Sequence, residues 1–190
     1  MIFDPIIFMN YYYFDIETYS PFTRPDPNSD KVITMQFQQV DKSGKPLSDL
    51  AILKEWESDE ETILRKFIAM FKPWNFVPIG NNLNFERIFL KTKCQKYSIS
   101  DLDKYGDLAY NFPSIDINAI FVILNSGQFK GSGMHNFTKK KVDGSHIANW
   151  YKNREYEKIE TYIKEEAIAF LDFYQRCYVE FPRILQEIKV

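Results

Sequence analysis

Hydrophobic and polar positions along the first part of the chain predict β-strands. Residues 11–18 are rich in aromatic and β-branched side chains, which favours a strand buried in a sheet. Residues 32–40 alternate between apolar and polar, as in a half-exposed strand, and residues 51–53 are a short apolar run. Turn-forming residues separate these three segments, so we expect an antiparallel meander. Residues 2–9 are expected to form a short strand or hairpin arm leading into it.

Helical spacing follows the predicted strands. Ser58 and Glu61 predict a capping box, after which an apolar stripe at helical spacing continues toward Pro73. The remaining predicted elements are, in chain order, a strand at 75–79, a helix at 84–93, a strand at 114–116, and helices at 117–124 and 155–188. We expect Pro182 to break or kink the last helix. This order predicts an α/β fold in which helices pack on one layered sheet.

The amino-acid composition indicates a folded globular protein. The 190 residues, 45% hydrophobic and 17% aromatic, predict a single folded domain over residues 1–190. A formal net charge of −2 gives no global basic footprint, so any contact with nucleic acid must come from local patches. Cys94 and Cys177 lack metal-binding spacing and fit a reducing compartment. With no signal-peptide pattern and no apolar run of membrane-spanning length, we expect a soluble, cytoplasmic protein.

Two acids lie inside the first predicted strand. Asp15 and Glu17 are two residues apart, so their side chains project from the same face, while Phe14 and Ile16 point to the other. A sheet interior does not accommodate two adjacent carboxylates unless something neutralises them, and Mg²⁺ favours such oxygen ligands. The pair therefore indicates either a metal site or a strand end at which both acids meet water.

Acids at two later places are further candidates. Glu86 lies in the first turn of the helix after an Asn-rich turn, where the helix dipole alone also favours an acid. Tyr162 and Glu166 are four residues apart and share one face of the last helix, beside an apolar stripe. The alternative for this second pair is a tyrosine at the edge of the core next to a solvated acid.

In this order the three places resemble the exonuclease motifs of the DEDD superfamily. The segments concerned are Asp15-Ile16-Glu17, Asn82-Leu83-Asn84-Phe85-Glu86, and the spacing from Tyr162 to Glu166-Ala167. The resemblance is to the tyrosine subclass, as in the exonuclease domain of family B DNA polymerases, and covers about Tyr11 to Phe173. The histidine subclass would need a histidine at Thr161, whereas the only histidines are His135 and His146.

The resemblance implies a ribonuclease H-like fold, with three antiparallel strands and further parallel strands in one mixed sheet flanked by helices. It also implies two Mg²⁺ or Mn²⁺ ions and stepwise 3′–5′ release of nucleotides, with single-stranded DNA as the expected substrate. In that scheme the four carboxylates of Asp15, Glu17, Glu86 and Glu166 hold the ions, and Tyr162 orients the attacking water. An unperturbed tyrosine is a poor base at neutral pH, which favours an orienting role.

Two departures from the family pattern affect this expectation. Glu86 and Glu166 stand where the family has aspartate, so each acid is one methylene longer. All four carboxylates are kept, which favours an active nuclease. The alternatives are a catalytically silent nucleic-acid-binding or scaffold domain, and a structure-specific or RNA-trimming nuclease that uses the same site.

Contacts to the nucleic acid are predicted from position and charge. Thr18 leaves the first motif next to the expected 3′ nucleotide, and Asn82 precedes the second helix, which it could cap. The basic run Lys139, Lys140 and Lys141 follows a Gly-rich loop and could guide a phosphate backbone. Its alternative is a solvated charge run.

Overall fold

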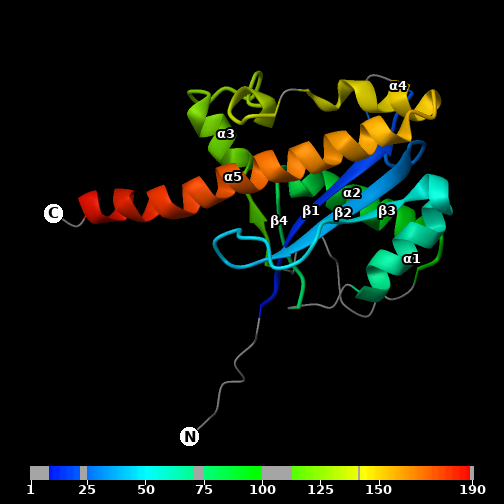
Figure 1. Ribbon diagram of the computed structural model, residues 1–190, viewed down its shortest axis with the longest axis horizontal. Helices are drawn as coiled ribbons and strands as arrows, with labels where there is room; N and C mark the ends of the chain where they lie inside the picture. Colours follow the sequence, from blue (N-terminus) through cyan, green and yellow to red (C-terminus); the bar gives the residue numbers. More distant parts are fainter. Residues whose placement is uncertain (1–8, 22–24, 71–74, 100–112, 141, 189–190) are drawn as a thin grey trace, which may run out of the picture.

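A computed structural model describes residues 9–21, 25–70, 75–99, 113–140 and 142–188 of the chain (Figure 1). The expected strand or hairpin arm at residues 2–9 falls almost wholly outside these ranges. Within them the elements alternate as the sequence pattern predicts, and the long last helix, α5 (Tyr156–Ile188), crosses one face of the sheet.

A five-stranded mixed sheet with strand order β3-β2-β1-β4-β5 forms the centre of the fold. Its strands are β1 (Tyr11–Tyr19), β2 (Lys31–Val40), β3 (Ala51–Lys54), β4 (Val77–Gly80) and β5 (Ile115–Asp116). The first three pair antiparallel as a meander, while β4 pairs parallel with β1 and β5 pairs parallel with β4. This arrangement confirms the predicted fold class of three antiparallel strands extended by parallel ones.

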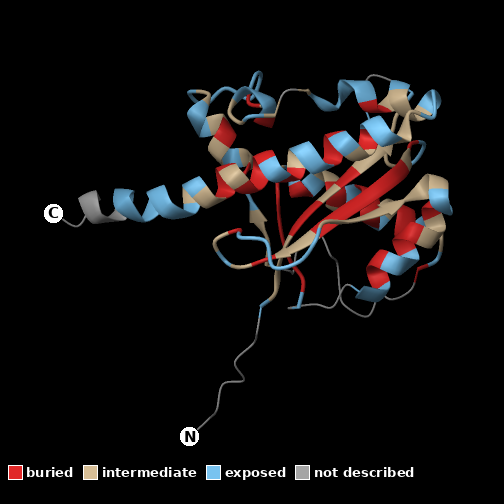
Figure 2. Cartoon of the chain, viewed as in Figure 1, coloured by how far each residue is buried: buried red, intermediate tan, exposed pale blue. Residues whose placement is uncertain are grey.

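Helices cover both faces of the sheet because β1 is apolar on both sides. Phe14 and Ile16 pack into a core with α1 (Glu60–Met70) and α2 (Leu83–Lys96), whereas Tyr13 packs against α3 (Asn118–Leu124) and α5. A third cluster joins α4 (Ile147–Lys152) to the first half of α5. Buried residues accordingly concentrate along the central strands and on the sheet-facing sides of the helices (Figure 2).

The start of α1 differs from the predicted capping box. The carboxylate of Asp59 accepts hydrogen bonds from the backbone N–H and the hydroxyl of Thr62, at 2.7 and 2.9 Å. Ser58 instead ends a short 3₁₀ helix, Glu55–Glu57. The prediction from Ser58 and Glu61 was therefore wrong by one residue, because an adjacent aspartate caps the same N–H groups at least as well as a serine.

Of the break or kink that Pro182 predicted in the last helix, the break is absent. Pro182 lies inside the helix, which continues from Tyr156 to Ile188 without a break. Proline removes one N–H and so frees the carbonyl of Tyr178, four residues earlier. Tyr178 and Pro182 are both exposed, so water can bond that carbonyl, and the loss is small enough for the helix to continue.

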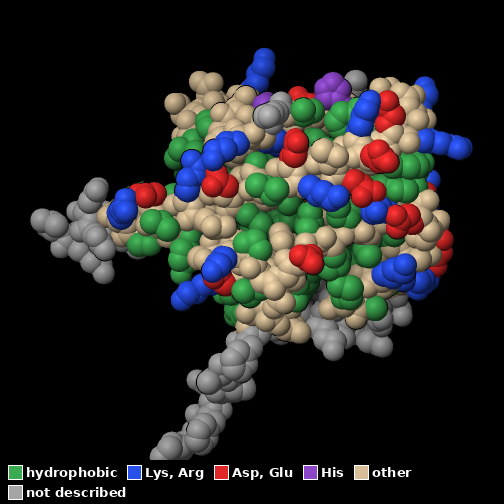
Figure 3. All heavy atoms as spheres, viewed as in Figure 1, with side chains coloured by type: hydrophobic (Ala, Val, Ile, Leu, Met, Phe, Trp, Pro, Cys, Tyr) green, Lys and Arg blue, Asp and Glu red, His purple; other side chains and the backbone are tan. Residues whose placement is uncertain are grey.

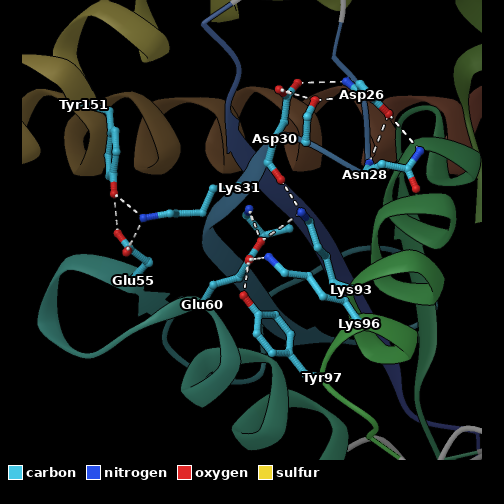
Figure 4. A network of polar contacts seen from close by, with 12 residues as sticks. Asp26, Asn28, Asp30, Lys31, Glu55, Glu60, Lys93, Lys96, Tyr97 and Tyr151 are labelled. Carbon is cyan, nitrogen blue, oxygen red and sulfur yellow. Dashed lines mark hydrogen bonds and ion pairs between the residues drawn. The ribbon is translucent and has the colours of Figure 1, made fainter.

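A buried polar cluster joins the two helices on one face to the start of β2 (Figure 4). The Glu60 carboxylate accepts from the N–H of Val32 at 2.7 Å and from the Tyr97 hydroxyl at 2.6 Å. It is also paired with Lys93 at 3.5 Å and with Lys96 at 3.4 Å. Lys93, which is 1% exposed, donates in addition to the carbonyl of Asp30. The loop that precedes β2 is thereby anchored to α1 and α2.

The outer surface carries mixed charge. In the view of Figure 3, basic and acidic side chains are interspersed, with apolar side chains between them and no broad field of one sign. No helix in the described ranges combines the length and the apolar character needed to cross a lipid bilayer.

Candidate active site

Strand β1 presents two carboxylates on the face opposite to Phe14 and Ile16. Asp15 pairs with Gln36 of β2 and Glu17 pairs with Thr34, and the register shifts directly after Glu17. The Gln36 side chain, which is 0% exposed, donates from Nε2 to Asp15 Oδ2 at 2.9 Å and accepts from the Thr34 hydroxyl at 2.9 Å. This row of buried polar side chains on β2 fixes the orientation of the Asp15 carboxylate.

Glu86 is positioned by the tight connection between β4 and α2. Asp116 of β5 accepts hydrogen bonds from the N–H groups of Asn82 and Leu83, at 2.9 and 2.8 Å, and so caps α2. A Cβ on Gly80 would lie 2.8 Å from the carbonyl oxygen of Phe14, so only glycine permits this close approach to β1. The first turn of α2 then carries Glu86 to the acids of β1.

Helix α5 supplies the remaining acid and the phenol. Tyr162 and Glu166 lie one helical turn apart on the sheet-facing side, and Tyr162 is 7% exposed. Ile163 and Ala167, their neighbours on that side, are buried in the clusters that fix α5 on the sheet. Packing of the helix therefore determines where the phenol and the carboxylate point.

The acids from these elements meet. One oxygen from each of Asp15, Glu17 and Glu166 lies within 4.8 Å of the other two. Glu86 is 3% exposed and lies close enough to Asp15 for the two charges to interact, and its Oε2 is buried without any hydrogen-bond partner in the described structure. Four carboxylates from two helices and one strand thus occupy one location, which we call the acidic centre.

Burial and mutual repulsion change the acidity of these groups. Burial, followed by the charge of Glu166, raises the pKa of Asp15 to about 7. Burial and then the charge of Asp15 hold the pKa values of both Glu17 and Glu86 well above the usual range of a glutamate. Metal-free, the centre therefore retains protons near neutral pH, and an ion that neutralises the carboxylates would displace them.

The place of Lys140 inside the acidic centre was not predicted from the sequence. Its Nζ donates to the Tyr162 hydroxyl and to Glu166 Oε1, each at 2.6 Å, and its side chain is 8% exposed. The ammonium also lies 4.5 Å from the centroid of the Tyr162 ring. Lys140 thus belongs to the acidic centre, whereas Lys139 next to it is 84% exposed and lies 3.7 Å from Asp172. Lys141, the last member of the basic run, lies outside the described residues.

Two further residues predicted to contact the nucleic acid lie in β1 and directly before α2. Thr18 follows the register shift of β1 and is half-buried. Asn82 is exposed in the left-handed conformation, at φ 63°, and its side chain makes no capping bond to α2. The cap on α2 comes from Asp116, 34 residues later, which no local pattern at Asn82 could indicate.

The donor set fits hard divalent cations. All four acids offer carboxylate oxygens, the ligand type that Mg²⁺ and Mn²⁺ prefer. The unpartnered Oε2 of Glu86 is the most specific sign, because a buried polar atom without a partner is costly unless another group satisfies it. The residues present therefore fit the ions that the sequence implied.

Comparison with known proteins finds similar folds among solved structures. No protein-family model matches the sequence, and no curated protein matches it either. Among solved structures, the chain is similar to the family B DNA polymerase from the hyperthermophilic archaeon Pyrobaculum calidifontis, with a TM-score of 0.66 and 14% identity. That match covers 92% of this chain and 25% of the polymerase.

A second similarity is to E. coli exonuclease I. Its complex with a dT13 oligonucleotide gives a TM-score of 0.64 at 10% identity, covering 94% of this chain and 43% of the exonuclease. The zinc-bound form of its complex with single-stranded DNA gives the same TM-score and covers 42% of that chain. The chain thus has the ribonuclease H-like fold of these exonuclease structures and spans less than half the length of the proteins it resembles.

Proposed function

We propose that this chain is a metal-dependent 3′–5′ exonuclease that acts on single-stranded DNA, in the tyrosine subclass of the DEDD superfamily. The observation that carries the proposal is the acidic centre, where a buried oxygen of Glu86, next to Asp15, has no hydrogen-bond partner in the ranges that the structure describes. The similarity in fold to a family B DNA polymerase and to exonuclease I in complex with single-stranded DNA supports it.

The four carboxylates of Asp15, Glu17, Glu86 and Glu166 would hold two Mg²⁺ or Mn²⁺ ions. When bound, such a pair of ions stabilises the attacking and leaving oxygens of an in-line phosphodiester displacement. Burial, followed by the charge of nearby Glu166, raises the pKa of Asp15 and so opposes its ionisation in the metal-free protein. The cations would thereby complete the charge balance of the site.

Tyr162 acts as an orienting group in this proposal. Its pKa is raised, first by burial and then by the charge of Glu17, so the phenol stays protonated at neutral pH. A protonated hydroxyl can hold an attacking water by hydrogen bonds but cannot remove its proton. The hydrogen bond and ring contact from Lys140 fix where that hydroxyl lies.

Few residues supply the positive charge that would contact the nucleic acid. We assign phosphate contacts to Lys139, Lys140 and Lys141, and contacts near the 3′ nucleotide to Thr18 and Asn82. Lys140 lies in the acidic centre and would meet the phosphate that is cleaved, while Lys139 is exposed and would meet one outside it. Because the chain has a net charge of −2, binding should rely on these local contacts.

End-labelled single strands of DNA and RNA incubated with Mn²⁺ test the proposal. The wild-type chain is expected to shorten a 5′-labelled DNA strand one nucleotide at a time from its 3′ end, and Asp15→Ala to abolish the ladder. Shortening of RNA in preference to DNA would indicate an RNA-trimming enzyme. Binding without cleavage at every Mn²⁺ concentration would contradict the proposal and favour the silent scaffold, which the glutamates at 86 and 166 leave as the second candidate.

A further inference from the structure

A hollow of about 360 Å³ is lined in part by Tyr162, a residue that it shares with the acidic centre. Val142 and Trp150 form one wall, and the outer face of α5 forms the other, through Glu157, Thr161 and Glu165. Tyr162 also lines the hollow, while its hydroxyl is bonded to Lys140 in the acidic centre. Tyr162 therefore belongs both to the proposed reaction site and to the lining of this hollow.

The walls of the hollow suit a flat aromatic ligand. The Trp150 indole lies 6.2 Å from the Tyr162 ring, edge to face at 64°, and is half-buried. His146 stacks on Trp150 at 5.5 Å and holds the indole in place. Aromatic walls of this kind bind nucleobases because every base offers a flat π-face, and Val142 adds apolar contact.

The charged side chains that line the hollow disfavour a bound phosphate and favour a ligand that donates hydrogen bonds. Glu157 and Glu165 are exposed, and no hydrogen bond or ion pair to either carboxylate is found in the described part of the chain. Lys158 also lines the hollow but is paired with Glu155 at 2.7 Å. Two free carboxylates repel a phosphate and accept hydrogen bonds from the amino groups of bases.

We infer that this hollow receives the base of the 3′-terminal nucleotide, with the scissile phosphate at the acidic centre and the base stacked against Trp150. The inference rests on the proposed function and adds a specificity to it. Guanine presents two adjacent N–H donors, which match one carboxylate, whereas thymine presents a single donor between two carbonyl groups. The site therefore favours terminal nucleotides with an exocyclic amino group, guanine first.

Quenching of tryptophan fluorescence by mononucleotides tests the inference without any phosphodiester cleavage. Titration with dGMP, dIMP and dTMP in the presence of Mn²⁺ is expected to quench Trp150, with dGMP binding about fivefold more tightly than dIMP, which lacks only the amino group. Trp150→Phe should remove the quench, and Trp150→Ala should weaken dGMP binding about tenfold, measured by equilibrium dialysis. Trp56→Phe is the matched control, because Trp56 stacks on Tyr156 and does not line the hollow.

The two acids give an independent variant. Glu157→Gln with Glu165→Gln should level the affinities for dGMP and dIMP without loss of folding, since both side chains are exposed. A quench that persists in Trp150→Phe, or equal affinities for dGMP and dIMP in the wild type, would overturn the inference. Strand shortening in that situation leaves the exonuclease proposal standing, whereas selective dGMP binding without any strand shortening removes the exonuclease and keeps a nucleotide site.

Discussion

Two buried glutamates show how differently this protein treats the same side chain. Glu60 and Glu86 both lie in the first turn of a helix that packs on the sheet, and they are 5% and 3% exposed. Glu60 is satisfied by a backbone N–H, a tyrosine hydroxyl and two lysines (Figure 4). Glu86 has another acid, Asp15, as its neighbour, and one of its oxygens has no partner in the described structure.

The difference separates a structural acid from one that is prepared for a ligand. Burying a carboxylate is tolerable when cations and donors surround it, and the Glu60 cluster provides both. At the acidic centre, Lys140 supplies the one ammonium that the described residues place against four carboxylates. A fold retains such an imbalance where a cation binds, so equivalent substitutions at the two glutamates should have opposite consequences.

The largest effect is expected from Glu60→Gln, on stability. Neutralising Glu60 leaves the ammonium of Lys93 buried without its anionic partner, which costs about 3–5 kcal/mol of the free energy of unfolding. Urea unfolding measures this loss. Glu61→Gln, in the same turn but half-exposed and, among the described residues, paired with Arg65 alone, should cost less than about 1 kcal/mol. Equal losses in the two variants would contradict the structural role of Glu60.

Glu86→Gln should affect activity instead. Burial and the charge of Asp15 raise the pKa of Glu86 and favour its protonated form in the metal-free protein, so an isosteric amide should change the free energy of unfolding by less than about 1 kcal/mol. Loss of a metal-holding charge should lower the rate of strand shortening by at least about 10²-fold. Glu86→Asp, which keeps the charge and restores the family residue, is the matched control and should stay within about tenfold of the wild type. A Glu86→Gln enzyme with wild-type activity would remove Glu86 from the proposed site.

The free energy of unfolding of the metal-free protein should fall as the pH rises, because folding raises the pKa of Asp15. Asp15 titrates at about 7 in the folded chain against an ordinary value of 3.8, so the folded state binds more protons between those values. The contribution of protonated Asp15 to the free energy of unfolding is therefore complete below about pH 4 and is lost as the pH rises through about 7. Thermal denaturation between pH 5 and 7.5 should show a falling midpoint that Mn²⁺ restores and that Asp15→Asn flattens. A midpoint that rises over this range in the metal-free protein, equally in wild type and Asp15→Asn, would contradict the raised pKa.

The smallest effect is expected from Lys140→Met, on metal affinity. The ammonium of Lys140 stabilises the charged forms of Asp15 and Glu17 and pairs with Glu166, so it competes with a cation for the same acids. Its removal should tighten Mn²⁺ binding about fivefold at pH 8, measured by titration calorimetry. Lys139→Met, which changes an exposed neighbour, should leave the affinity unchanged. Weaker binding in Lys140→Met would mean that the lysine assists the metal.

Local patterns were sufficient to predict most elements of the fold. The aromatic and β-branched run at β1, the alternation at β2 and the apolar stripe of α5 each reflect burial on one or both faces, which the period of the sequence records. Helix ends were less predictable, as Asp59 in place of Ser58 illustrates, because neighbouring polar residues compete for the same N–H groups. Helix α4 was missed, since six residues are too few to carry a period.

The sequence by itself determined which side chains could do chemistry: two acids on one face of a strand, an acid in the first turn of a helix, and a tyrosine one turn before a glutamate. Only the tertiary structure decided that these acids share one location, that Glu86 Oε2 has no hydrogen-bond partner among the described residues, and that Lys140 is bonded to Tyr162 while Lys139 is exposed. The physical reason is that a sequence pattern reports only on neighbouring residues. Periodicity reports the environment of each segment, whereas the pairing of charges depends on residues brought together from distant parts of the chain by the packing of helices on the sheet.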